Sequence, residues 1–167
     1  MICECVDIFS LNSFNQEFYK GMYNDFSPVE VADEELRGTL SFEAFLVQAR
    51  ELITSSGLED YLGFRLIHRH FDVKENEVMV EKFENCDQVD SLVTSASHLT
   101  VDAVPASWIF SKSGTFPFEF STDQAVKDGL CKLTNNPHVF LLLRDLILEN
   151  NLEKLIAVAI LKREHLQ

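Results

Sequence analysis

The stretch "SWIFSKSGTFPFEFS", residues 107–121, carries the clearest signal of the fold. Two runs rich in aromatic and apolar residues flank Lys-Ser-Gly at 112–114. A Ser-Gly pair suits a tight turn, because glycine adopts a positive φ without steric cost. We therefore predict an antiparallel β-hairpin here.

Side chains alternate between the two faces of a strand, so this hairpin predicts which residues lie together. One face holds Ile109, Phe116, Phe118 and Phe120. Trp108 and Glu119 share the other. If helices leave that face uncovered, Trp108, Phe110 and Glu119 form an anchor for a partner protein, and a packed core is the alternative. Pro117 cannot donate to a ladder, which favours an edge strand or a bulge.

Helical spacing of apolar residues appears on both sides of the hairpin in the chain. An apolar stripe runs over 42–53, with Ser41 as a candidate N-cap and Gly57 just past its end. A weaker helix is expected over 122–133. A more secure one covers 137–147, where proline occupies the first helical position.

The remaining patterns favour strands. The apolar run 155–161 fits a buried central strand, although helical spacing is also present and stays an alternative. Residues 62–71 and 77–83 read as two strands, and the polar segment 72–76 between them predicts a second hairpin. The fold class that follows is α+β, with an antiparallel sheet built from two hairpins plus a C-terminal strand, and helices packed on one face.

The length of 167 residues predicts a single domain. Within it, residues 1–38 are expected to be an irregular acidic segment with room for one short helix, and 39–167 to be the core. The four cysteines show no Cys-x-x-Cys spacing. Acidic residues at Glu4 and Asp7 do not suit a secretory signal, and no apolar run is long enough to span a bilayer. We therefore expect an intracellular, cytoplasmic protein.

Charge gives the main expectation about partners. Fourteen basic against 27 acidic residues give a net charge of −13, and no basic patch is present beyond the short "LKRE" at 161–164. Such a surface disfavours nucleic acid and favours a basic protein partner. No Gly-x-Ser-x-Gly, phosphate-binding glycine loop or His-Glu-x-x-His occurs. The first expectation is therefore a non-catalytic interaction protein of the inhibitor, immunity or adaptor type.

Two histidines give the alternative expectation. His68 and His70, two residues apart on a predicted strand, point to the same face. If 72–76 closes a hairpin, His68 faces Glu81, and two imidazoles with one carboxylate form a candidate site for a divalent transition metal. In the structural interpretation, a histidine bonds to the neighbouring acid and supports the sheet. Arg65 and Arg69 would then lie on the opposite, solvated face.

The same region resembles the first motif of the cupin family. Gly63, His68, His70 and Glu75 follow its order, with a four-residue gap after the glycine. The resemblance implies a jelly roll that holds a metal ion through these side chains. The second cupin motif, Pro-x-Gly with a downstream histidine, is absent from the sequence. A small metal-binding enzyme or ligand-binding protein is thus the alternative function.

Overall fold

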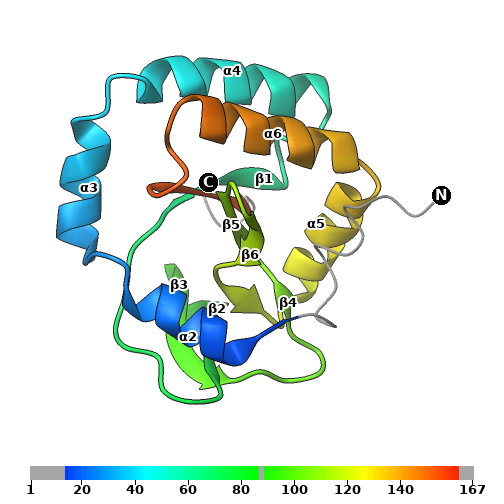
Figure 1. The fold of residues 1–167 in the computed structure, drawn as a ribbon. Coiled ribbons are helices and arrows are strands. Elements are labelled where there is room, and N and C mark those ends of the chain that lie inside the picture. Colours follow the sequence, from blue (N-terminus) through cyan, green and yellow to red (C-terminus); the bar gives the residue numbers. More distant parts are fainter. Residues whose placement is uncertain (1–13, 87–88, 162–167) are drawn as a thin grey trace.

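A computed structural model describes residues 14–86 and 89–161. This part of the chain contains five helices and eight strands, shown in Figure 1. The helices are α2 (Gln16–Asn24), α3 (Val29–Arg37), α4 (Phe42–Ser55), α5 (Gln124–Thr134) and α6 (Pro137–Glu149). The strands are β1 (Leu62–Leu66), β2 (Glu77–Cys86), β3 (Val89–His98), β4 (Val104–Pro105), β5 (Ser107–Ser111), β6 (Gly114–Pro117), β7 (Phe120–Ser121) and β8 (Ile156–Ile160). The α+β class is confirmed.

The strands form two four-stranded sheets. Sheet one has the order β1-β8-β5-β6 and is antiparallel throughout. Sheet two has the order β3-β2-β7-β4, in which β2 and β7 run parallel and the other pairs run antiparallel. The architecture is therefore two sheets with helices, where the sequence predicted one sheet.

The hairpin predicted from residues 107–121 is present as β5 and β6. Ser111 pairs with Gly114 at the turn, and Trp108 pairs with Pro117. Because β6 is the last strand of sheet one, the prediction of an edge strand from Pro117 is confirmed.

The second predicted hairpin is wrong. Strand β1 pairs with β8, and β2 pairs with β3, so 62–71 and 77–83 belong to different sheets. The segment between them crosses from one sheet to the other. The side chain of Asn24 holds this crossing segment in place, because it donates a hydrogen bond to the carbonyl of Val73 and accepts one from the Val73 amide. An alternating pattern predicts a strand but leaves its pairing partner open.

The C-terminal strand is confirmed as β8. All five of its residues are buried, and it lies between β1 and β5. Both of its faces are covered, which is why it reads as a continuous apolar run. Ile156 and Val158 face one core, and Ala157 faces another.

The first core lies between sheet one and helices α4, α5 and α6. It contains Phe45, Ala49, Trp108, Val126, Leu133, Phe140, Leu143 and Val158. The second core contains Tyr19, Tyr23, Ile67, Met79, Ile109, Phe118, Phe120 and Ala157. Helix α2 packs on this second core, so the helices do not all lie on one face. Figure 1 shows α4 and α6 on the opposite side of the strands from α2.

The helices predicted after the N-terminal segment are confirmed. Gly57 follows α4 with a φ of 72°, and proline begins α6. Ser41 occupies the N-cap position of α4, but its hydroxyl donates to the carbonyl of Asn150, 3.0 Å away. Since Asn150 follows α6, this bond joins the start of α4 to the end of α6. The two helices therefore run antiparallel.

The N-terminal segment differs from the prediction in its described part. Residues 14–38 contain two helices, α2 and α3, where one short helix was expected. Asn15 caps α2 by accepting a hydrogen bond from the Phe18 amide. Residues 1–13, with the acidic pair Glu4 and Asp7, lie outside the described part. Across residues 14–86 and 89–161, no helix has the length and apolar character needed to cross a bilayer.

Candidate functional site

The two histidines lie together just beyond the end of β1. The ring centroids of His68 and His70 are 4.5 Å apart, with 55° between the planes. The strand ends at Leu66, and Nδ1 of His68 donates to the Leu66 carbonyl at 2.7 Å. The rings are thus neighbours, as predicted, but they belong to the crossing segment and not to the strand.

Glu81 contacts an arginine. Its side chain is 1% exposed, and its Oε2 lies 3.5 Å from a terminal nitrogen of Arg65. Arg65 therefore points into the protein, which corrects the prediction that it lies on a solvated face. Arg69 bonds to the Asn24 carbonyl and to Asp72.

The carboxyl group beside the histidines comes from the connection between β6 and β7. Oε2 of Glu119 lies 3.8 Å from Nε2 of His70. Among the described residues, no group of three or more His, Cys, Asp or Glu side chains is arranged to hold a metal ion. His68, His70 and Glu81 are therefore not assembled as the predicted ligand set. Glu75 of the cupin-like motif lies in the loop before β2, and helices cover the sheets where a jelly roll was implied.

Arg65, His70, Glu81 and Glu119 together form what we call the buried ionisable cluster. It joins β1, the crossing segment, β2 and the β6–β7 connection. Burial, and then repulsion from Glu81, raises the pKa of Glu119 to about 8, although Arg65 opposes the shift. Burial also raises the pKa of Glu81, against the opposing charge of Arg65 and with a smaller contribution from Asp123.

Two groups of the buried ionisable cluster, His70 and Glu119, are neutral at pH 7. Burial, followed by the charges of His68 and Arg65, lowers the pKa of His70, so its imidazole is neutral. Glu119 holds a proton, and the Arg65 guanidinium lies beside the Glu81 carboxyl group. Although His70 and Glu119 lie within 4 Å, they are therefore two neutral groups and not an ion pair at pH 7.

Several oxygens in the buried ionisable cluster have no hydrogen-bond partner in the described protein. They are both carboxylate oxygens of Glu81 and Oε2 of Glu119. Buried polar atoms without partners destabilise a fold by about 1 to 3 kcal/mol each. The cluster therefore lowers the stability of the fold. Buried ionisable groups with shifted pKa values occur both at functional sites and in structural ion-pair networks.

Two tyrosines of α2, which were not among the predicted site residues, form hydrogen bonds with this region. The Tyr19 hydroxyl donates to the Phe118 carbonyl at 2.6 Å and accepts from the Met79 amide at 3.1 Å. The Tyr23 hydroxyl accepts from the His70 amide at 3.3 Å. Burial raises the pKa of both hydroxyls. Their spacing of four residues on one helix was the signal that could have found them.

The predicted partner anchor lies in the interior. Trp108 is 0% and Phe110 1% exposed, and both rings contact the ring of Phe140 in the first core. Glu119 is also buried, in the cluster described above. The three side chains do not form a surface patch, because α6 covers the Trp108 face of the hairpin.

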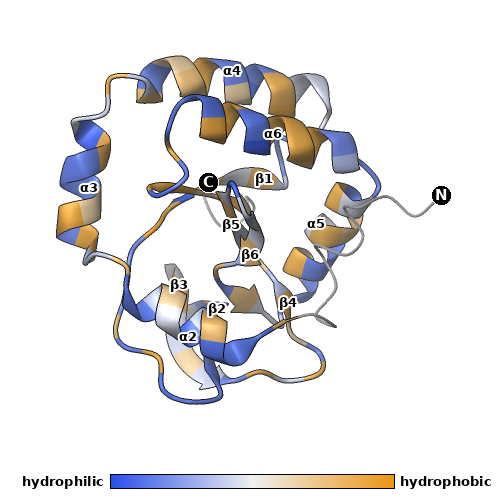
Figure 2. Ribbon diagram, viewed as in Figure 1, coloured by the Kyte–Doolittle hydropathy of each residue, from blue (hydrophilic) through white to orange (hydrophobic). Residues whose placement is uncertain are grey.

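A surface groove lies between α4 and α6. It has a volume of about 380 Å³. Its lining residues are Gln48, Glu51, Leu52, Ser55, Leu142, Asp145, Leu146 and Glu149. We call its leucines, Leu52, Leu142 and Leu146, the floor, and its acidic residues, Glu51, Asp145 and Glu149, the walls. Figure 2 shows a mixture of hydrophobic and hydrophilic residues along both helices. The exposed fraction of Leu142 is 47%, which is high for a leucine on a core helix.

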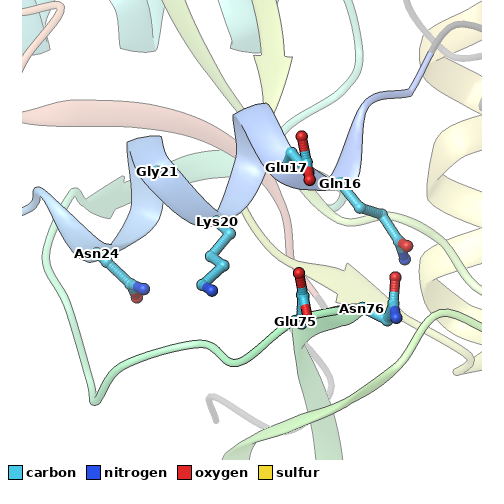
Figure 3. Close-up of a pocket in the computed structure, with 7 residues that line it drawn as sticks. All are labelled: Gln16, Glu17, Lys20, Gly21, Asn24, Glu75 and Asn76. Carbon is cyan, nitrogen blue, oxygen red and sulfur yellow. The ribbon is translucent and has the colours of Figure 1, made fainter.

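A second hollow, of about 520 Å³, lies beside α2. Figure 3 shows Gln16 and Lys20 extending from α2 toward the loop that carries Glu75 and Asn76. Its lining is polar and of mixed charge, and Asn24 is already bonded to Val73. Ligand pockets usually combine an apolar lining with a few polar groups, so this hollow fits that description less well than the α4–α6 groove.

No protein-family model, no curated protein and no solved structure matches this chain.

Proposed function

We propose that this protein is a non-catalytic interaction protein that binds a basic protein partner through the α4–α6 groove. The observation that carries the proposal is the leucine floor of the groove between carboxylate-bearing walls. An apolar area with a charged rim is typical of protein interfaces, in which the apolar part supplies affinity and the rim supplies orientation.

The charge on the neighbouring helices supports a basic partner. Helices α3, α4 and α6 together carry eight acidic residues and three arginines. Two of these arginines are already paired within the protein, Arg37 with Asp33 and Arg144 with Asp145. With a net charge of −13 for the chain, the field favours association with a positive surface and repels nucleic acid.

The buried ionisable cluster supports the non-catalytic part of the proposal. Glu81 and Glu119 are almost fully buried; Glu81 lies beside Arg65, and Glu119 holds a proton at pH 7. Their burial keeps these two carboxyl groups away from a substrate, which a catalytic acid or base must reach. The exposed Leu142 lies elsewhere, on α6 in the lining of the groove.

The proposal is tested by quantitative affinity enrichment with matched baits. The first variant, Glu51→Gln/Glu149→Gln, removes two groove carboxylates. The control, Glu17→Gln/Asp25→Asn, removes the same charge from exposed positions on and just after α2, on the other side of the molecule. We expect the wild type and the control to retain a basic protein that the groove variant does not retain.

The association rate of that protein must then fall steeply with salt. Electrostatically steered association slows as ionic strength rises, because the Debye length shortens from about 10 Å at 0.1 M to about 3 Å at 1 M. If both variants retain the same proteins, or if association is indifferent to salt, the proposed function is wrong.

A further inference from the structure

We infer that the partner segment in the α4–α6 groove is an amphipathic α-helix, with an apolar face on the leucine floor and lysine or arginine on both flanks. This inference rests on the proposed function and specifies the partner. It follows from the form of the groove, its floor and the position of its charges.

The form of the groove disfavours two other ways of binding a peptide. An extended segment adds to a sheet through free backbone groups at a strand edge. The groove lies between two helices, whose backbone groups bond within each helix. A polyproline segment needs aromatic side chains to pack on, and the lining contains none. A helix that lays its apolar face into the groove suits a leucine-lined surface between two helices.

The floor matches the repeat of a helix. Leu142 and Leu146 are four residues apart and form a ridge along α6, and Leu52 faces them from α4. The groove spans residues 142–149 of α6, or about 11 Å at a rise of about 1.5 Å per residue. This length accommodates two turns of a third helix, with apolar side chains at positions i, i+3 or i+4, and i+7.

The acidic residues of the groove walls indicate which charge the partner helix carries on its flanks. Glu51 lies on the α4 wall and Glu149 on the α6 wall. Within the described part of the chain, neither of them takes part in an ion pair, whereas Asp145 is held by Arg144. Cationic side chains on both sides of the apolar face therefore complement the groove. A second copy of this chain would bring the same acidic walls, and like charges repel.

The test uses a designed probe and two protein variants. The probe is an 18-residue peptide with leucine at helical spacing and lysine on both flanks. Its comparison peptide has the same charge, with two central residues on the polar face replaced by proline, which breaks a helix. Leu142→Ser removes the exposed part of the floor. Val47→Ser is the matched control, because Val47 is 67% exposed on α4 but does not line the groove.

We expect the helical probe to bind the wild type at least tenfold more tightly than the proline peptide, measured by fluorescence anisotropy in moderate salt. Leu142→Ser is expected to weaken the binding of the helical probe at least fivefold, and Val47→Ser to leave its affinity unchanged. Circular dichroism checks that both variants keep the fold.

Three results would overturn the inference. The first is equal binding of the two peptides, or no binding of the helical probe. The second is an equal loss in Leu142→Ser and Val47→Ser. The third is a dimer of the protein that Leu142→Ser dissociates, since the occupant is then a second copy. If the bait comparison still separates Glu51→Gln/Glu149→Gln from its control, the proposed function survives the failure of the helix inference.

Discussion

Replacing Glu119 with glutamine should remove a pH dependence of stability that this one carboxyl imposes on the fold. Glu119 is buried, and its pKa in the folded protein is about 8, against an ordinary value of 4.5. In the unfolded chain the carboxyl ionises near its ordinary value. Between these two values the folded state binds one more proton than the unfolded state. Stability must therefore fall as pH rises through this window and level off above about pH 8.

The magnitude follows from the two pKa values. One unit is worth about 1.36 kcal/mol, so the full difference corresponds to about 5 kcal/mol, and the part accumulated by pH 7 to about 3 kcal/mol. Glutamine is neutral in both states and similar in shape. Glu119→Gln should therefore be more stable than the wild type at pH 7 by up to about 3 kcal/mol, and close to it near pH 5. Relaxation around the carboxyl makes these values upper limits.

The assay is urea unfolding followed by circular dichroism, from pH 5 to pH 9. The quantity of interest is the difference in free energy of unfolding between the variant and the wild type, because groups common to both cancel. Glu17→Gln, on the exposed side of α2, controls for the loss of one surface carboxylate. If this difference does not change with pH, or if the wild type becomes more stable relative to Glu119→Gln as pH rises, Glu119 is ionised in the folded protein. The charge assignment of the buried ionisable cluster would then be wrong.

Three further changes test other parts of the structure. Glu81→Gln should shift the pH dependence contributed by Glu119 to lower pH in the same urea assay, because repulsion from Glu81 raises the pKa of Glu119; an unchanged pH dependence would contradict the coupling of the two carboxyl groups. Gly129→Ala should cost about 1 to 3 kcal/mol, because the added methyl meets the side chain of the last β8 residue, whereas Gly21→Ala has open space and should gain up to about 1 kcal/mol. Opposite shifts in melting temperature are the expected readout. Zinc should leave the melting temperature unchanged, because the two neighbouring imidazoles have no third ligand arranged with them in the described residues; a saturable rise would show that they acquire one.

Local patterns predicted most of the elements correctly. The β5–β6 turn, the apolar stripe of α4, the proline at the start of α6 and the apolar run of β8 are all read from neighbouring residues. These signals act over a few residues, through backbone geometry and the burial of one face. They therefore need no knowledge of the rest of the chain. The helical alternative for 155–161 was excluded only when β1 and β5 were found on either side of β8.

The pairing of strands could not be predicted in this way. β1 is alternating and apolar, and it satisfies its backbone equally well against β2 or β8. The pairing of β1 with β8 depends on the packing of both cores. It brings together residues that are nearly 100 positions apart in the chain. Because of this wrong pairing, we predicted Glu81 beside the histidines, whereas Glu119 lies there.

Composition and local periodicity by themselves determined that the chain forms helices and antiparallel strands around apolar cores, and that its surface is strongly acidic. The tertiary structure alone decided which charges meet in the interior and which apolar side chains stay outside. Arg65, Glu81 and Glu119 come together across two sheets, and Leu142 remains exposed although its helix is apolar. The physical reason is that electrostatic and packing interactions depend on distance in space, and distance along the chain does not fix that separation.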